Sequence, residues 1–98
     1  MTAFVRELTD FAAPRKTSGS VEEISRHGCY VDTMNVLPVG TSLEVSTSRG
    51  QETFVTKGDV IYILERRGMG IEFTDTPTGQ LEILDSWLAE RSSIVAII

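Results

Sequence analysis

With 98 residues, the chain has room for one domain, residues 1–98, and is too short for a two-domain enzyme. Nine Lys and Arg against fourteen Asp and Glu give a formal net charge of -5, and this acidity argues against DNA or RNA as a partner, because a phosphate backbone is repelled. The first twenty residues are the least acidic stretch, since Arg6, Arg15 and Lys16 there outnumber Glu7 and Asp10.

The cysteine count and the apolar runs indicate the compartment. A single cysteine, Cys29, excludes an intrachain disulfide and favours a reducing environment, so we expect a cytoplasmic protein. The N-terminus lacks the charged start and apolar run of a secretory signal. The longest apolar stretch, Ile94–Ile98, is far shorter than the about 20 residues that cross a bilayer, so we expect no membrane insertion.

The N-terminal segment fits two periodicities. Phe4, Leu8 and Phe11 share one face of a helix, whereas Phe4, Arg6 and Leu8 share one face of a strand. The residues by themselves leave both alternatives open.

From Ser20 to Phe73, apolar residues alternate with polar ones in short segments separated by glycine, which is typical of half-buried antiparallel strands. The inward residues would be Cys29 and Val31, then Leu43 and Val45, then Met69, Ile71 and Phe73. The longest run, Thr53–Leu64, is rich in β-branched and aromatic residues, and Gly58 within it predicts a bulge. We expect turns at Pro38–Gly40, Arg49–Gly50 and Arg67–Gly68, where glycine allows a tight reversal.

After Phe73 the periodicity becomes helical. Thr76 and Pro77 suit the N-cap and the first helical position, and an apolar face follows. This face consists of Leu81, Leu84, Trp87 and Leu88. The spacing predicts one helix of about four turns that caps the sheet, with Trp87 in the contact and its indole N–H bonded near the rim.

The apolar tail Ile94–Ile98 follows this helix and has no polar face. One expectation is that it folds back as a terminal strand or fills a barrel mouth. The other is that it adds as a strand to a protein partner or to a second copy in a homodimer.

Catalytic and metal-binding patterns are weak. With one histidine, His27, and one cysteine, no ligand set with zinc spacing exists, and the usual glycine-rich phosphate cradles are missing. Neighbouring acids such as Glu22 and Glu23 are explained by exposed charge. We therefore expect no enzyme activity, no metal and no cofactor.

The most informative stretch is the turn Glu23–Gly28, with the sequence E-I-S-R-H-G. Ser25 offers a donor and an acceptor, Arg26 can pair with phosphate or lie flat on a base, and Gly28 permits close backbone approach. The simpler alternative is a hairpin turn in which Ser25 hydrogen-bonds to its own backbone.

Two motifs and their order resemble the PilZ domain family, which are bacterial receptors for cyclic di-GMP. E-I-S-R-H-G is similar to the family's D/N-x-S-x-x-G, and G-M-G-I-E-F at residues 68–73 is similar to its closing strand before the C-terminal helix. The resemblance covers about residues 18–91, leaving residues 92–98 as the apolar tail. It implies a six-stranded antiparallel β-barrel, mainly β, with one C-terminal amphipathic α-helix, and it favours a strand within Phe4–Phe11.

The resemblance also implies a ligand site from which this sequence departs. In the family, an R-x-x-x-R pair ahead of the first strand clamps the ligand, and the serine turn contacts a guanine edge. Arg6 has Thr2 and Asp10 at the matching offsets, and Arg15 has Phe11 and Gly19, so the pair is missing. The first motif position is Glu23, one methylene longer than aspartate.

Two alternatives remain for the missing cations: Arg15, Lys16 and Arg26 form a substitute anion site, or the arginines belong to sequence upstream of this chain.

Two functional hypotheses follow. The first is a cyclic di-GMP receptor or adaptor of bacterial signalling, with Glu23, Ser25 and Gly28 at the guanine and with Arg15 and Arg26 as substitute cations. The second is a degenerate PilZ-like domain that no longer binds cyclic di-GMP and acts in protein interaction or oligomerisation.

Overall fold

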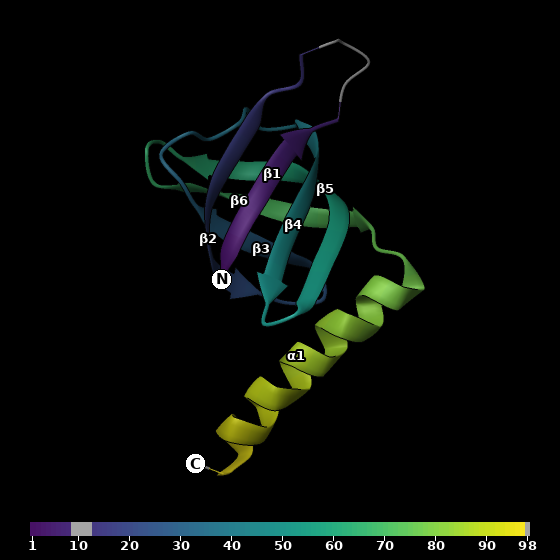
Figure 1. The fold of residues 1–98 in the computed structure, drawn as a ribbon. Helices are drawn as coiled ribbons and strands as arrows, with labels where there is room; N and C mark the ends of the chain where they lie inside the picture. Colours follow the sequence, from purple (N-terminus) through teal and green to yellow (C-terminus); the bar gives the residue numbers. More distant parts are fainter. Residues whose placement is uncertain (9–12, 98) are drawn as a thin grey trace.

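The computed structural model describes residues 1–8 and 13–97, with side chains described for residues 1–8 and 13–90. Its elements are β1 (Thr2–Glu7), β2 (Lys16–Ile24), β3 (Gly28–Asp32), β4 (Ser42–Arg49), β5 (Glu52–Leu64), β6 (Gly68–Asp75) and α1 (Thr78–Ile97). The strands form a closed antiparallel barrel in the order β1-β2-β3-β6-β5-β4, from which α1 leads away (Figure 1). The barrel and the C-terminal helix implied by the resemblance are confirmed.

The alternation predicted for the strands is confirmed by their burial. Val5 is 2% exposed whereas Phe4 is 63% exposed, so the N-terminal segment follows the two-residue period of a strand. The barrel core is built from one inward side chain in every two. Its buried members are Ala3, Val5, Val21, Cys29, Val31, Leu37, Leu43, Val45, Val60, Met69 and Ile71.

Glycines mark the irregular points of the barrel. The register of β5 against β6 shifts between Lys57 and Gly58, which confirms the predicted bulge. Gly40 and Gly50 have positive φ angles of 91° and 62°, as their turns require. The turn predicted at Arg67–Gly68 is placed differently: the left-handed residue is Arg66, with φ of 60°. Gly68 instead begins β6. Glycine is needed there for packing, because a Cβ would come within 2.4 Å of the Tyr30 hydroxyl oxygen.

The start of α1 differs by one position from the prediction. The backbone N–H of Leu81 donates to the carbonyl of Pro77 at 2.9 Å, so Pro77 stands in the capping position and Thr78 begins the helix. The hydroxyl of Thr76 lies 2.7 Å from that of Thr56, and this contact ties the segment before the helix to β5.

The first half of α1 packs on the barrel through the predicted apolar face. Leu84 and Trp87 are buried against Phe54 of β5, and the rings of Trp87 and Phe54 meet edge-on with centroids 6.2 Å apart. The indole N–H of Trp87 donates to Glu52 Oε1 at 3.2 Å, and the amide oxygen of Gln80 accepts from Val55 N–H at 2.8 Å. This cluster is a second core, separate from that of the barrel.

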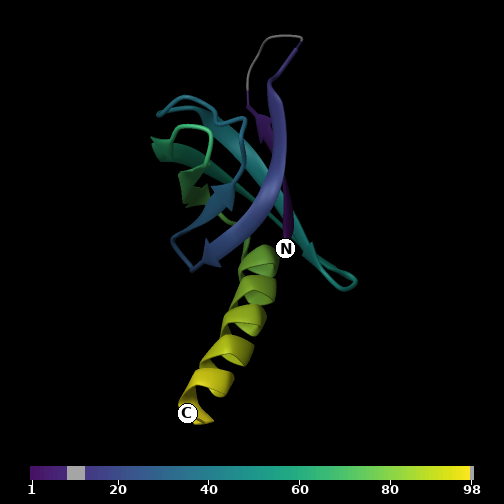
Figure 2. The same ribbon diagram turned by 90° about the vertical axis from the view of Figure 1, so that its left-hand side faces the viewer.

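The C-terminal half of α1 extends beyond the barrel in both views (Figures 1 and 2). The backbone of the tail continues the helix to Ile97, so the two strand forms predicted for Ile94–Ile98 are wrong over residues 94–97. The physical reason is local, since no glycine or proline follows Gly79 to end the helix. Residue 98 and the side chains of residues 91–97 lie outside the described residues. Within the described part of the chain, no helix is long and apolar enough to cross a membrane.

Trp87→Ala is expected to destabilise the protein by about 3–5 kcal/mol, because it removes the largest side chain of the second core. Trp87→Phe retains a ring against Phe54 and loses the donor to Glu52, so we expect a loss of about 1–2 kcal/mol. Urea unfolding followed by circular dichroism measures both. Equal stability of the wild type and the alanine variant would contradict this packing.

Candidate functional site

The turn between β2 and β3 is held by the hydrogen bonds of its own backbone and of Ser25. The Ser25 N–H donates to the Gly28 carbonyl at 2.9 Å, and the Ser25 hydroxyl oxygen accepts from the His27 N–H at 3.2 Å. The hydrogen bonds expected of a simple hairpin turn, in which Ser25 bonds to the backbone of its own turn, are therefore present. Ser25 and His27 nevertheless remain exposed, so their side chains are available to a ligand.

Gly28 is required by the packing of the barrel. A Cβ at this position would lie 2.2 Å from the Ile71 carbonyl oxygen of β6. The His27 carbonyl accepts from the Phe73 N–H at 2.8 Å, which fixes the turn against the same strand. The close backbone approach that Gly28 was expected to permit is therefore the approach of strand β6.

Beside the turn, a solvent-open cavity of about 490 Å³ lies over the outer surface of β3, β6 and β5. We call it the serine-turn cavity. It is lined by Glu23, Ile24, Ser25, His27, Gly28, Cys29, Tyr30, Ile61, Tyr62, Gly70, Ile71 and Glu72. Glu23, Ser25 and Gly28, the turn residues for which a guanine contact is predicted, are all among these lining residues.

Two tyrosines of this cavity were missed by the sequence reasoning. Tyr30 of β3 and Tyr62 of β5 both pair with Gly70 of β6, and their rings stack with centroids 6.3 Å apart. A Cβ on Gly70 would come within 2.1 Å of the Tyr62 ring, so the glycine makes room for it. The only sequence signal was the alternation that places Tyr30 opposite Cys29, on the outer face of its strand.

The charge of the serine-turn cavity is negative. Glu23 and Glu72 line it, and no Lys or Arg is among its described lining residues. Arg26 lies in the turn but outside the lining, where its Nε is 3.0 Å from Asp85 Oδ1 of α1. This ion pair links the turn to the helix.

Arg15 lies at the other end of β2. The nine residues of this strand, at about 3.3 Å per residue, span roughly 30 Å and separate Arg15 from the serine turn. The Arg15 guanidinium bonds to Glu7, with Nε 3.1 Å from Oε1, and this side-chain hydrogen bond lowers the pKa of Glu7. The structure does not gather Arg15, Lys16 and Arg26 into one anion site.

The described residues of this site include neither a reactive thiol nor a cluster that would hold a metal ion. Burial raises the pKa of the Cys29 thiol to about 12, so it is protonated at neutral pH. Over residues 1–8 and 13–90, no three His, Cys, Asp or Glu side chains gather in a way that would hold a metal ion.

The Cys29 thiol is expected to stay unreactive toward a disulfide reagent at pH 8 in the folded protein and to react fully in urea. Because its folded pKa is raised above the unfolded value near 9.0, its contribution to stability is complete below about pH 9 and falls as pH rises toward 12. Urea titrations between pH 8 and 11 measure this loss, and Cys29→Ala is the control that should lack it. Identical pH profiles of the two proteins would contradict a buried neutral thiol.

Comparison with known proteins supports the resemblance to this family. A family model described as PilZ domain matches residues 3–90, which is most of the chain. No curated protein and no solved structure matches the sequence. With the family pattern covering β1 through most of α1, the chain belongs to the PilZ domain family.

Proposed function

We propose that this chain is a cytoplasmic, non-catalytic cyclic di-GMP receptor or adaptor of bacterial signalling. One observation carries the proposal: the serine turn of the family pattern borders a cavity that contains Glu23, Ser25 and Gly28 together. Cyclic di-GMP-type signalling is the general role of the family, and binding by this chain is the step that we propose.

The lining of the cavity suits a guanine base. A carboxylate at Glu23 can accept two hydrogen bonds from the N–H groups on one edge of guanine, and the Ser25 hydroxyl lies next to it in the same lining. Tyr62 is 47% exposed and offers a ring on which a base can stack. These contacts suit a planar ligand that has hydrogen-bond donors on its edge.

The phosphates of the ligand depend on Arg26. Its ion pair with Asp85 is half exposed on both sides, and such pairs contribute only about 0–1 kcal/mol, so a phosphate oxygen can replace the carboxylate. Each charge-assisted hydrogen bond contributes about 1.5–3 kcal/mol, so one arginine in place of two lowers the affinity by a few powers of ten at most. We expect binding weaker than that of a complete arginine clamp.

A second candidate is the degenerate domain that works through protein contacts alone. It is favoured by the two carboxylates, Glu23 and Glu72, which repel a dianionic ligand, and by the pairing of Arg15 and Arg26 with acids. The two candidates share the same fold and differ in whether the serine-turn cavity binds a nucleotide.

Calorimetric titration with cyclic di-GMP distinguishes them. Ser25→Ala and Arg26→Ala are each expected to weaken binding about tenfold, which is about 1.4 kcal/mol. Asp85→Ala frees Arg26 and should strengthen binding by a few-fold, within the roughly 1 kcal/mol of its ion pair. Lys57→Ala removes an exposed cation of β5 outside the cavity and serves as the control. No heat and no shift in melting temperature at high-micromolar ligand would reject the receptor and leave the second candidate.

A gain-of-function variant tests whether only the cations limit binding. The Met1 carbonyl accepts from the Val21 N–H at 2.7 Å, so residues added before Met1 begin beside β2, four positions from Ser25. An added Arg-x-x-x-Arg segment is expected to strengthen binding at least tenfold, and an added Gln-x-x-x-Gln segment should not. Equal affinity of the two variants would show that the cavity does not orient a phosphate near this strand.

A further inference from the structure

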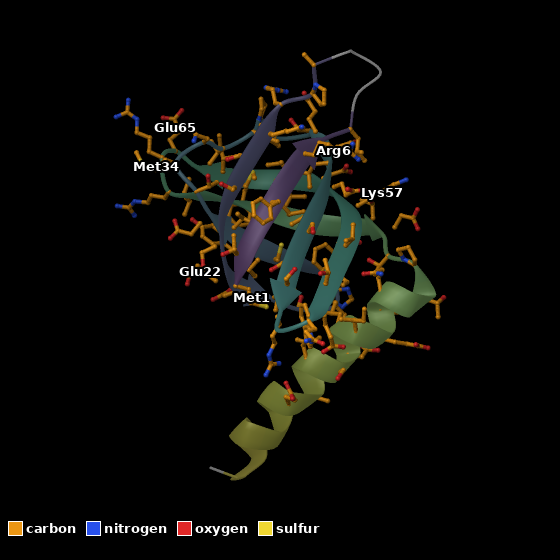
Figure 3. The ribbon with its side chains drawn as sticks, viewed as in Figure 1. Met1, Arg6, Glu22, Met34, Lys57 and Glu65 are labelled. Atoms are coloured by element: carbon orange, nitrogen blue, oxygen red, sulfur yellow. The ribbon has the colours of Figure 1, made fainter. Side chains whose placement is uncertain are left out.

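A second cavity, of about 570 Å³, lies at the other end of β2 and β3 from the serine turn. We call it the basic cavity. Its walls come from the start of β2, from the loop after β3 and from the turn between β5 and β6. Met34 and Glu65, two of its lining residues, are labelled together at the barrel edge far from α1 (Figure 3).

The basic cavity has the opposite charge to the rest of the chain. Among its described lining residues, Arg15, Lys16 and Arg66 are cationic and Glu65 alone carries a carboxylate, although the chain as a whole has nine Lys and Arg and fourteen Asp and Glu. Arg15 is paired with Glu7. For Lys16 and Arg66, no ion-pair partner lies within 4.0 Å among the residues whose side chains are described.

An apolar surface lies among these cations. Met34 is 74% exposed, the highest value among the exposed large hydrophobic residues described, whereas Leu37, which lines the same cavity, belongs to the barrel core at 5%. Methionine and arginine are enriched in protein–protein interfaces, where an apolar centre is surrounded by charge. The mixture indicates a partner with both carboxylates and an apolar side chain.

Thr33 forms hydrogen bonds to all three segments that make up the walls of the basic cavity, so these walls are linked before any partner binds. Its hydroxyl oxygen lies 3.1 Å from that of Thr17 in β2 and accepts from the Asn35 N–H at 3.2 Å. Its own N–H donates to the Arg67 carbonyl of the β5–β6 turn at 2.9 Å. A partner therefore meets a formed surface and does not have to order these three segments.

Arg66 holds a backbone conformation that suits glycine better. Its φ of 60° is in the left-handed region, and the turn is closed by the Arg67 N–H, which donates to the Leu64 carbonyl at 2.9 Å. Non-glycine residues in this region are strained and occur preferentially at functional sites. Here the strained residue contributes a guanidinium to the lining of the cavity.

We propose that the basic cavity binds an acidic segment of a protein partner, with carboxylates on Lys16 and Arg66 and an apolar side chain on Met34. A bound phosphate group is usually held by converging backbone N–H groups. The Thr33 and Asn35 N–H groups of this wall already donate within the protein, so the positive charge comes from long side chains around an apolar surface. The proposal holds whether or not the serine-turn cavity binds a nucleotide.

The test is a titration of the ¹⁵N-labelled chain with an acetylated, amidated peptide of four glutamates and two leucines, followed by amide chemical shifts. We expect shifts at Lys16, Asn35 and Arg66, and an affinity that falls with added salt. The double variant Lys16→Glu with Arg66→Glu should weaken binding at least tenfold. Lys57→Glu, an exposed charge reversal on β5 outside this lining, should leave the affinity within twofold (Figure 3).

Arg66→Gly separates binding from folding. It removes the guanidinium and relieves the left-handed strain, so we expect a melting temperature equal to or above that of the wild type together with at least threefold weaker peptide binding. Shifts that are absent at millimolar peptide, or that persist unchanged in the double variant, would overturn the proposal. Inorganic pyrophosphate giving the same shifts at lower concentration than the peptide would assign the cavity to a small phosphate-bearing molecule and would also overturn it.

Discussion

β1 closes the barrel, because this strand pairs with β2 along one edge and with β4 along the other. Closure leaves no free strand edge in the sheet and brings β2 and β4, which are not neighbours in the chain, to either side of the same six residues. It also fixes the direction of β2, with the serine turn at one end and Arg15 and Lys16 at the other. The serine-turn cavity and the basic cavity therefore lie near opposite ends of β2.

The two cavities differ in the charge of their lining residues. Glu23 and Glu72 line the serine-turn cavity, whereas Arg15, Lys16 and Arg66 line the basic cavity. Arg26 is connected through Asp85 to α1, and Arg49 is connected through Glu90 to the same helix. The helix therefore shares one ion pair with the serine turn and one with the end of β4.

Much of the fold could be predicted from periodicity. The alternation of Leu43 and Val45 with polar neighbours, and the helical spacing of Leu84 and Trp87, gave correct strands, a correct helix face and the correct buried residues. The strand predicted for the tail Ile94–Ile98 was wrong over residues 94–97: that prediction rested on an apolar run with no polar face, whereas nothing in the sequence ends the preceding helix. The bulge at Gly58 was foreseen, whereas the left-handed turn residue was not, since Arg66 breaks the preference for glycine.

The sequence by itself determined the strands between Ser20 and Phe73, the helix and the serine turn, because each depends on neighbours within a few residues along the chain. The N-terminal segment fits a helix as well as a strand, and pairing with β2 and β4 decided that it is a strand. Only the tertiary structure decided which charges meet. It joined Arg26 to Asp85 and set Tyr30 and Tyr62 on either side of Gly70. Tyr30 and Tyr62 are 32 positions apart in the chain, and their contact follows from the register of the closed sheet. Arg26 and Asp85 are 59 positions apart, and their ion pair follows from the packing of α1 against the barrel.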